Sequence, residues 1–215
     1  DPYDMAPRVD ALFTGAPPAG LKDTALTPRI GVLYTATPLI KPYASYALGF
    51  RAPNYSEVNS GFTNLAGGYT TISNPNLQAE TSRGYELGIK GADARLGYQL
   101  AVFDNRYQDF IEQVTLTCPG DPQCSPLVAT TFQNRNLAKV RIVGVEARAE
   151  YRLAQNWQVR GNLAWHRGTD ESRNQPLSSI NPARANFSLA YTPGIWGMEA
   201  HLTAAAKNDR VDESG

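Results

Sequence analysis

Hydrophobic and polar residues alternate along much of the chain, most clearly between residues 142 and 153. There the odd-numbered positions from Val143 to Leu153 are Val, Ala, Tyr or Leu, and the even-numbered positions from Glu146 to Arg152 are all charged. A period of two is typical of a β-strand whose two faces meet different surroundings. The pattern recurs, and the eight strands that it predicts are 29–37, 42–51, 80–91, 95–108, 142–153, 157–166, 185–192 and 196–207.

The connections between these strands alternate between short and long. Tight turns are predicted at residues 38–41, 92–94, 154–156 and 193–194, and long connections at residues 52–78, about 112–131 and about 168–182. Transmembrane barrels of the outer membrane have this asymmetry, because their periplasmic turns are short and their extracellular loops are longer. The predicted fold is therefore an all-β, antiparallel transmembrane β-barrel meander.

Aromatic residues strengthen this prediction. Five of them occupy apolar strand faces within a few positions of a short turn: Tyr98, Tyr151, Trp157, Tyr191 and Trp196. Rings of Tyr and Trp are favoured at a membrane interface, where the apolar body meets lipid and the polar edge meets water. The charged faces would then line a wet lumen. In a soluble β-sandwich, the alternative, the same rings would fill the core and the charges would face solvent.

Composition limits the other possibilities. The 215 residues include 20 basic and 20 acidic side chains, so charge gives no reason to expect a nucleic-acid partner. No run of 18 apolar residues is present, which excludes a transmembrane helix. The chain starts at Asp1 and ends in a polar run, so we expect a fragment that supplies about eight strands of a larger barrel.

The two cysteines, Cys118 and Cys124, lie in the turn-rich stretch "TCPGDPQC". A local disulfide fits this spacing and would indicate an oxidising compartment. A soft metal site is the alternative, although it would have only two thiols and no nearby histidine. Because the closed loop is so short, the entropic gain of a disulfide should fall below the ~3 kcal/mol of a 15-residue loop.

The sequence contains none of the common catalytic motifs. G-x-S-x-G, H-E-x-x-H and a phosphate-binding loop are all absent, and no usable His/Cys pair occurs. The alternation places most Asp and Glu residues on a charged strand face beside Arg and Lys. We therefore expect that the protein is not an enzyme and has no catalytic residues.

Several stretches carry a family resemblance. They are "YASYALGFRAP", "NPNLQAETSRGYELGIKG", "LGYQLAVFDNRYQDFI", "NLAKVRIVGVEARAEYRL" and "NWQVRGNLAWHRGT". Together they resemble the C-terminal half of TonB-dependent outer-membrane receptors, from about Leu26 to Asp212. The boxes "FRAP" (50–53) and "NPNL" (74–77), which bracket one long loop, resemble the haem-uptake subgroup of the Phu or Has kind.

The resemblance implies a barrel of roughly 22 strands around an N-terminal plug. Residues 1–215 would then be a partial receptor barrel domain, with the plug and the last strands absent, and residues 52–78 would be a long extracellular loop. The protein would cross the outer membrane of a Gram-negative bacterium many times, surrounded by lipid and lipopolysaccharide. Energy for import would come from the TonB–ExbB–ExbD complex through the plug.

The implied substrate is haem, free or carried by a haemoprotein, and it would be transported rather than used as a catalytic cofactor. Haem iron would be the only metal bound. The alternative is a ferric-siderophore receptor of the same superfamily, and a passive porin-like barrel is the less favoured third reading. A siderophore would need no single protein ligand, because it already fills the coordination sphere of the iron.

In haem receptors, a histidine of the loop between the two boxes usually binds the iron. Here that loop has no histidine, because the two in the chain are His166 and His201. Tyr69, which follows Gly67 and Gly68, is the candidate replacement, since a phenolate oxygen is an established axial ligand of haem iron. The two glycines would let the backbone approach the porphyrin closely. The alternative is a surface tyrosine that packs against Phe62 or Leu65.

Three other residues are candidate substrate contacts. Tyr55 is near the end of a strand, where a rim aromatic residue is the alternative role. Arg51 extends an inward strand face and could pair with a haem propionate through two parallel hydrogen bonds, although a structural role is favoured. His166 ends a strand and points inward, where a satisfied lumen histidine is the alternative.

Overall fold

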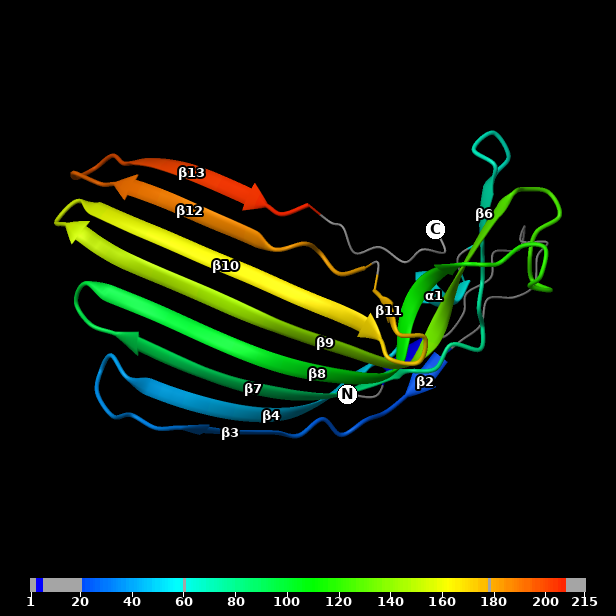
Figure 1. The fold of residues 1–215 in the computed structure, drawn as a ribbon, viewed down its shortest axis with the longest axis horizontal. Coiled ribbons are helices and arrows are strands. Elements are labelled where there is room, and N and C mark those ends of the chain that lie inside the picture. Colours follow the sequence, from blue (N-terminus) through cyan, green and yellow to red (C-terminus); the bar gives the residue numbers. More distant parts are fainter. Residues whose placement is uncertain (1–2, 6–20, 60, 178, 208–215) are drawn as a thin grey trace.

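The computed structural model describes residues 3–5, 21–59, 61–177 and 179–207. Eight antiparallel strands form the main path of one curved, open sheet of eleven described strands (Figure 1), which confirms the predicted fold class. In order across the sheet they are β13 (Met198–Ala205), β12 (Arg184–Tyr191), β10 (Trp157–Asp170), β9 (Thr130–Ala154), β8 (Leu96–Thr115), β7 (Glu80–Ala92), β4 (Lys41–Arg51) and β3 (Arg29–Leu33). Each of these strands is hydrogen-bonded to the strands that precede and follow it in this order, as in a meander.

Smaller elements lie between and beside these strands. They are α1 (Tyr55–Asn59), β5 (Phe62–Asn64), β6 (Tyr69–Ile72), β11 (Gln175–Pro176) and a separate two-stranded pairing of β1 (Tyr3–Met5) with β2 (Leu21–Asp23). Within the described residues, no helix is long and apolar enough to cross a membrane.

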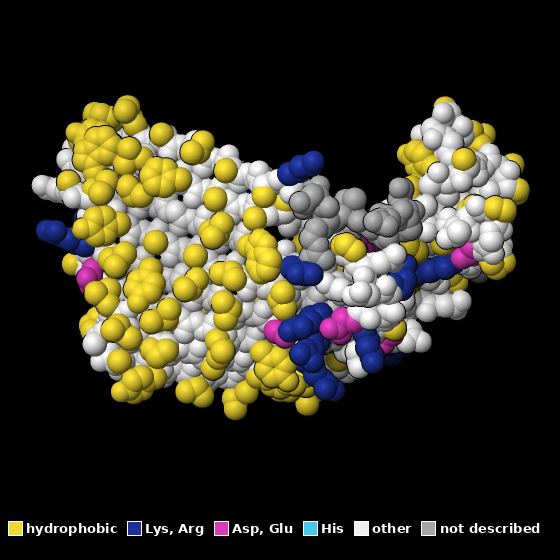
Figure 2. All heavy atoms as spheres, viewed as in Figure 1, with side chains coloured by type: hydrophobic (Ala, Val, Ile, Leu, Met, Phe, Trp, Pro, Cys, Tyr) yellow, Lys and Arg dark blue, Asp and Glu magenta, His cyan; other side chains and the backbone are white. Residues whose placement is uncertain are grey.

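The two faces of the sheet differ as the alternation predicts. One face carries exposed apolar side chains along its length, including Leu87, Val102, Leu163 and Phe187. Figure 2 shows hydrophobic side chains spread as a broad band over the part of this face that β7 to β13 form. So much exposed apolar surface is abnormal for a water-soluble monomer and suits a face that contacts lipid. The other face is the inward one.

Aromatic rings gather at the short-turn end of this apolar face. Trp157 stacks on Tyr191 with ring centroids 4.5 Å apart, and Trp196 meets Tyr191 edge-on at 5.8 Å. Tyr151 and Trp157 remain about two-fifths exposed. This arrangement is that of an interfacial aromatic girdle.

β8 and β9 are longer than predicted, although the loop between them, residues 116–129, lies within the predicted range of about 112–131. β8 continues to Thr115, and β9 begins at Thr130, twelve residues before the predicted start. The ladder between them continues up to the pair Thr115 and Phe132. Beyond the apolar band both strand faces contact polar loops, so hydrophobic alternation disappears although the backbone pairing remains.

A small core lies on the inward face at the long-loop end. Leu137, Val140 and Leu177 are buried there, and Tyr107 and Ile180 pack around them. Leu177 and Ile180 belong to the connection after β10, which therefore folds back over β9 instead of extending into solvent. This core supports the base of the loops that form the candidate site.

Candidate functional site

The loop between β4 and β7 is folded rather than irregular. α1 begins after Asn54, whose Oδ1 accepts a hydrogen bond from the Glu57 backbone N–H (2.9 Å). In return, Glu57 Oε2 accepts one from the Asn54 N–H (2.8 Å). This reciprocal arrangement is a capping box, and it stabilises a helix of only five residues.

Arg51 closes the base of the loop. Its Nε and Nη2 donate to the two carboxylate oxygens of Glu80 (2.8 and 2.6 Å), and its Nη1 donates to both oxygens of Glu57 (2.8 and 2.9 Å). Glu80 is buried and also accepts the backbone N–H of Ile111 (2.7 Å). Hydrogen bonds from the two carboxylates, first from Glu80, raise the pKa of Arg51, which lies beyond the apolar band.

These contacts define what Arg51 can do. Three of its nitrogens are already bound to carboxylates that come from α1 and from the start of β7. A haem propionate could therefore pair with Arg51 through two parallel hydrogen bonds only by displacing one of them. Glu57 is the easier to displace, because its side chain is 20% exposed while that of Glu80 is 7% exposed.

Amide side chains of the loop and of β9 hold the loop against β9. Asn74 Nδ2 donates to the backbone oxygen of Asn134 (2.8 Å), and Asn134 Nδ2 donates to that of Glu57 (3.0 Å). Gln133, which is fully buried, donates to the backbone oxygen of Ser73 (3.1 Å). These contacts of the β9 residues were not predicted from the sequence. The polar run "QNRN" (133–136) was the available signal.

Tyr69 begins β6, which pairs with β5 on one side and runs parallel to β9 on the other. Its half-buried ring lies between two phenylalanines, 6.3 Å from Phe62 and 6.1 Å from Phe132 by ring centroids. The contact with Phe62 is the packing role that the sequence also allows for Tyr69. In the described part of the chain, no hydrogen bond involves the Tyr69 hydroxyl group.

The glycines before Tyr69 have local structural roles. A Cβ atom at Gly67 would lie 2.8 Å from Asn64 Nδ2 and 2.9 Å from Tyr69 Cε1, so only glycine leaves room for both side chains. Gly68 has a φ of 70°, a left-handed conformation that L-residues with side chains rarely adopt. Both glycines thus shape the β5–β6 turn around the Tyr69 ring.

The other candidate contacts lie apart from Tyr69. Tyr55 is the first residue of α1 and is about half exposed. His166 points inward from β10, 3.1 Å from Glu146 and edge-on to Phe103. Among the described residues, no hydrogen bond, ion pair or ring contact joins Tyr69 to Arg51, Tyr55 or His166.

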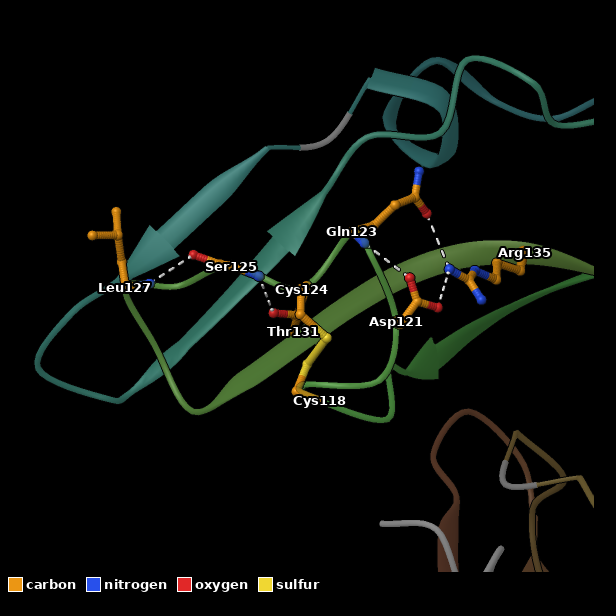
Figure 3. Close-up of a disulfide and its surroundings, with 8 residues drawn as sticks. All are labelled: Cys118, Asp121, Gln123, Cys124, Ser125, Leu127, Thr131 and Arg135. Carbon is orange, nitrogen blue, oxygen red and sulfur yellow. Dashed lines mark hydrogen bonds and ion pairs between the residues drawn. A yellow bond between two sulfur atoms is a disulfide. The ribbon is translucent and has the colours of Figure 1, made fainter.

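The loop between β8 and β9 packs beside the β5–β6 hairpin (Figure 3). Cys118 and Cys124 form a disulfide in it, with Cα atoms 5.8 Å apart. Arg135 of β9 donates to Asp121 Oδ2 (2.7 Å) and to Gln123 (3.0 Å). The pKa of Asp121 is lowered by the Gln123 backbone N–H and then by Arg135.

The two long loops therefore form one body above the sheet. The backbone N–H of Thr130 donates to the oxygen of Gly68 (3.1 Å), beside the parallel pairing of β6 with β9. In the described ranges, no three His, Cys, Asp or Glu side chains lie close enough together to hold a metal ion.

An antiparallel sheet with a lipid-facing apolar side, short turns at one end and folded loops at the other is the structure of a transmembrane barrel segment. A family model described as "TonB dependent receptor-like, beta-barrel" matches residues 3–214, and the chain belongs to this family. It is therefore part of the outer-membrane barrel of a Gram-negative receptor.

Known relatives cover the chain well but are much longer. It is 28% identical over 190 residues to "Hemoglobin-haptoglobin utilization protein B" of Neisseria meningitidis, covering 79% of this chain and 23% of the relative. It is 27% identical over 197 residues to "Hemoglobin-haptoglobin-binding protein A" of Haemophilus influenzae, covering 87% and 18%. The chain thus spans about a quarter or less of the length of these relatives.

Solved structures agree on the fold. "Copper transporter OprC" matches with a TM-score of 0.68 and 22% identity, over 86% of this chain and 27% of that one. At this level of identity, the structural similarity shows the fold alone.

Proposed function

We propose that this chain is a ligand-binding part of a receptor that binds haem at the cell surface and imports it in a TonB-dependent way. The observation that carries the proposal is the loop body above the sheet. There the loop between the two boxes presents a tyrosine, lacks histidine, and is fixed to β9 by backbone and amide hydrogen bonds. The names of the relatives support haemoglobin as a source of the haem.

The partners follow from this proposal. Haem is the transported substrate, delivered by a haemoprotein, and the TonB–ExbB–ExbD complex supplies energy through a plug domain. Outer-membrane lipid and lipopolysaccharide surround the apolar face. No catalytic residue or catalytic cofactor is part of the proposal, and the long loops, including residues 52–78, are extracellular.

Tyr69 is the proposed ligand of the haem iron. Among the described residues its hydroxyl group makes no hydrogen bond that binding would have to break, and its ring is oriented by Phe62 and Phe132. A phenolate is a hard anionic donor that suits ferric iron. Arg51, Tyr55 and His166 remain candidate contacts, with Arg51 acting only where a propionate displaces Glu57.

The test is a titration of the complete receptor with ferric haem, followed in the visible spectrum. Tyr69→Phe keeps the ring between its two neighbours and removes only the oxygen. We expect at least a tenfold weaker affinity, which is about 1.4 kcal/mol, together with a changed spectrum. Tyr55→Phe, the other tyrosine of the loop, keeps the ring of a candidate rim contact and should leave the haem spectrum as in wild type. An unchanged spectrum and affinity in Tyr69→Phe would exclude Tyr69 as the ligand.

A ferric-siderophore receptor is the second candidate, and the observation that favours it is the packing of Tyr69. A ring held between two phenylalanines is also what a purely structural tyrosine would show. The same titration decides, because a siderophore receptor would leave the spectrum of added haem unchanged in the wild type itself.

A further inference from the structure

Three arginines lie side by side on the lipid-facing surface. The registers of the sheet place Arg83 of β7 directly opposite Arg106 of β8, and Arg106 directly opposite Arg141 of β9. Directly opposite residues of neighbouring strands share a face, so the three guanidinium groups project on the same side. Arg83 is exposed, and the side chains of Arg106 and Arg141 are 59% and 43% exposed.

This row marks the edge of the apolar band. Two positions closer to the short turns, the same face carries the ring pair of Tyr46 and Tyr85, and below that lie Leu87 and Val102. Figure 2 shows the change clearly, because the charged side chains gather where the apolar band ends. The arginines therefore lie at the level of lipid headgroups, at the end of the sheet that carries the long loops.

The row is not neutralised by the protein. Asp104 binds Arg141 through both of its oxygens, at 2.6 to 3.2 Å, and lies 3.5 Å from Arg106. Arg83 has no ion pair among the described residues. A neighbouring hollow of about 470 Å³ adds Arg167 and Glu171. Four arginines thus face two carboxylates, which leaves two positive charges in excess.

Like charges placed directly opposite each other destabilise a sheet. The arrangement is stabilised once an anion binds between the guanidinium groups, and the planar fork of arginine matches phosphate oxygens particularly well. Because the neighbouring surface is apolar, the anion that fits is attached to acyl chains.

We propose that the row formed by Arg83, Arg106 and Arg141 binds the phosphate groups of an outer-leaflet lipid whose acyl chains lie on the apolar face below. The site rests on the orientation of the long loops toward the cell exterior. It does not depend on the identity of the transported substrate. Arg167 and the hollow beside it extend the site toward β10.

The test measures binding of diphosphorylated lipid A to the complete receptor in a neutral detergent. The variant Arg83→Gln with Arg106→Gln should bind at least tenfold more weakly than wild type. The control, Arg95→Gln with Arg152→Gln, removes the same charge at the short-turn end and should bind as wild type. Lipid A stripped of phosphate should bind wild type and variant equally weakly. Equal binding of the phosphorylated form by wild type and variant would overturn the proposal.

A second measurement separates a lipid site from arginines that only support the fold. Without lipid, the variant should melt at the same temperature as wild type or higher, because the like-charge repulsion has been removed. Added diphosphorylated lipid A should raise the melting temperature of wild type more than that of the variant. A variant that melts lower without lipid and responds equally to lipid would contradict the site. The variant should bind haem with the same affinity as wild type. The lipid result would then not depend on the proposed function.

Discussion

Arg51 joins three parts of the molecule through one side chain. It ends β4, binds Glu57 in α1, and binds Glu80 at the start of β7. The sequence placed it on an inward strand face and favoured a structural role. It could not indicate the partners, because Glu57 and Glu80 approach Arg51 only after the intervening loop has folded.

Removing Glu80 should loosen this loop. In Glu80→Ala, the guanidinium of Arg51 and the backbone N–H of Ile111 lose a buried acceptor, which costs about 1–3 kcal/mol. We expect hydrogen exchange in α1 and at Ile111 to become about tenfold faster or more in the complete receptor, as measured by mass spectrometry. Glu150→Ala is the control, since Glu150 is exposed and its contact to Gln158 is 3.4 Å long. Equal exchange in both variants would show that Glu80 does not hold the loop.

Tyr69 illustrates the limit of site prediction at this scale. Its position in a loop without histidine was visible in the sequence, and so was a packing role beside Phe62. The contact with Phe132 could not be predicted from the sequence, because it depends on a parallel pairing between segments about sixty residues apart. Which of the two roles Tyr69 has is a question for the haem titration.

At the scale of elements, alternation found every long strand of the sheet. It works where one face meets lipid and the other meets a wet lumen, because each residue then carries a clear chemical signal. It failed for the outer half of β9, where the amides Gln133, Asn134 and Asn136 hold loop segments. The short elements α1, β5 and β6 were missed for the same reason, since their stability comes from docking on β9.

The disulfide should restrain one loop and leave the barrel intact. In Cys118→Ser with Cys124→Ser, the loss is about 2 kcal/mol at most, because the closed loop is short. We expect faster proteolytic cleavage between Leu116 and Ala129 in the complete receptor, with unchanged barrel assembly on gels. Thr117→Ser, an exposed conservative change beside Cys118, is the control. Cleavage at the wild-type rate would mean that Arg135 and Asp121 suffice to hold the loop.

At the scale of the whole molecule, architecture and cargo are separate questions. The sheet is shared with a copper transporter at 22% identity, so the fold by itself does not identify what is carried. The proposed cargo depends on the loop body and on the names of relatives that are several times longer than this chain. A functional test must therefore use the complete receptor.

The most direct test is growth of an iron-starved Gram-negative host on haemoglobin as the only iron source, with the complete receptor as its only haem receptor. Haem import through this barrel predicts growth when TonB is present and none when TonB is deleted, with slower growth for Tyr69→Phe. Growth on a ferric siderophore but not on haemoglobin would contradict the haem proposal, and growth on haemoglobin without TonB would contradict active transport.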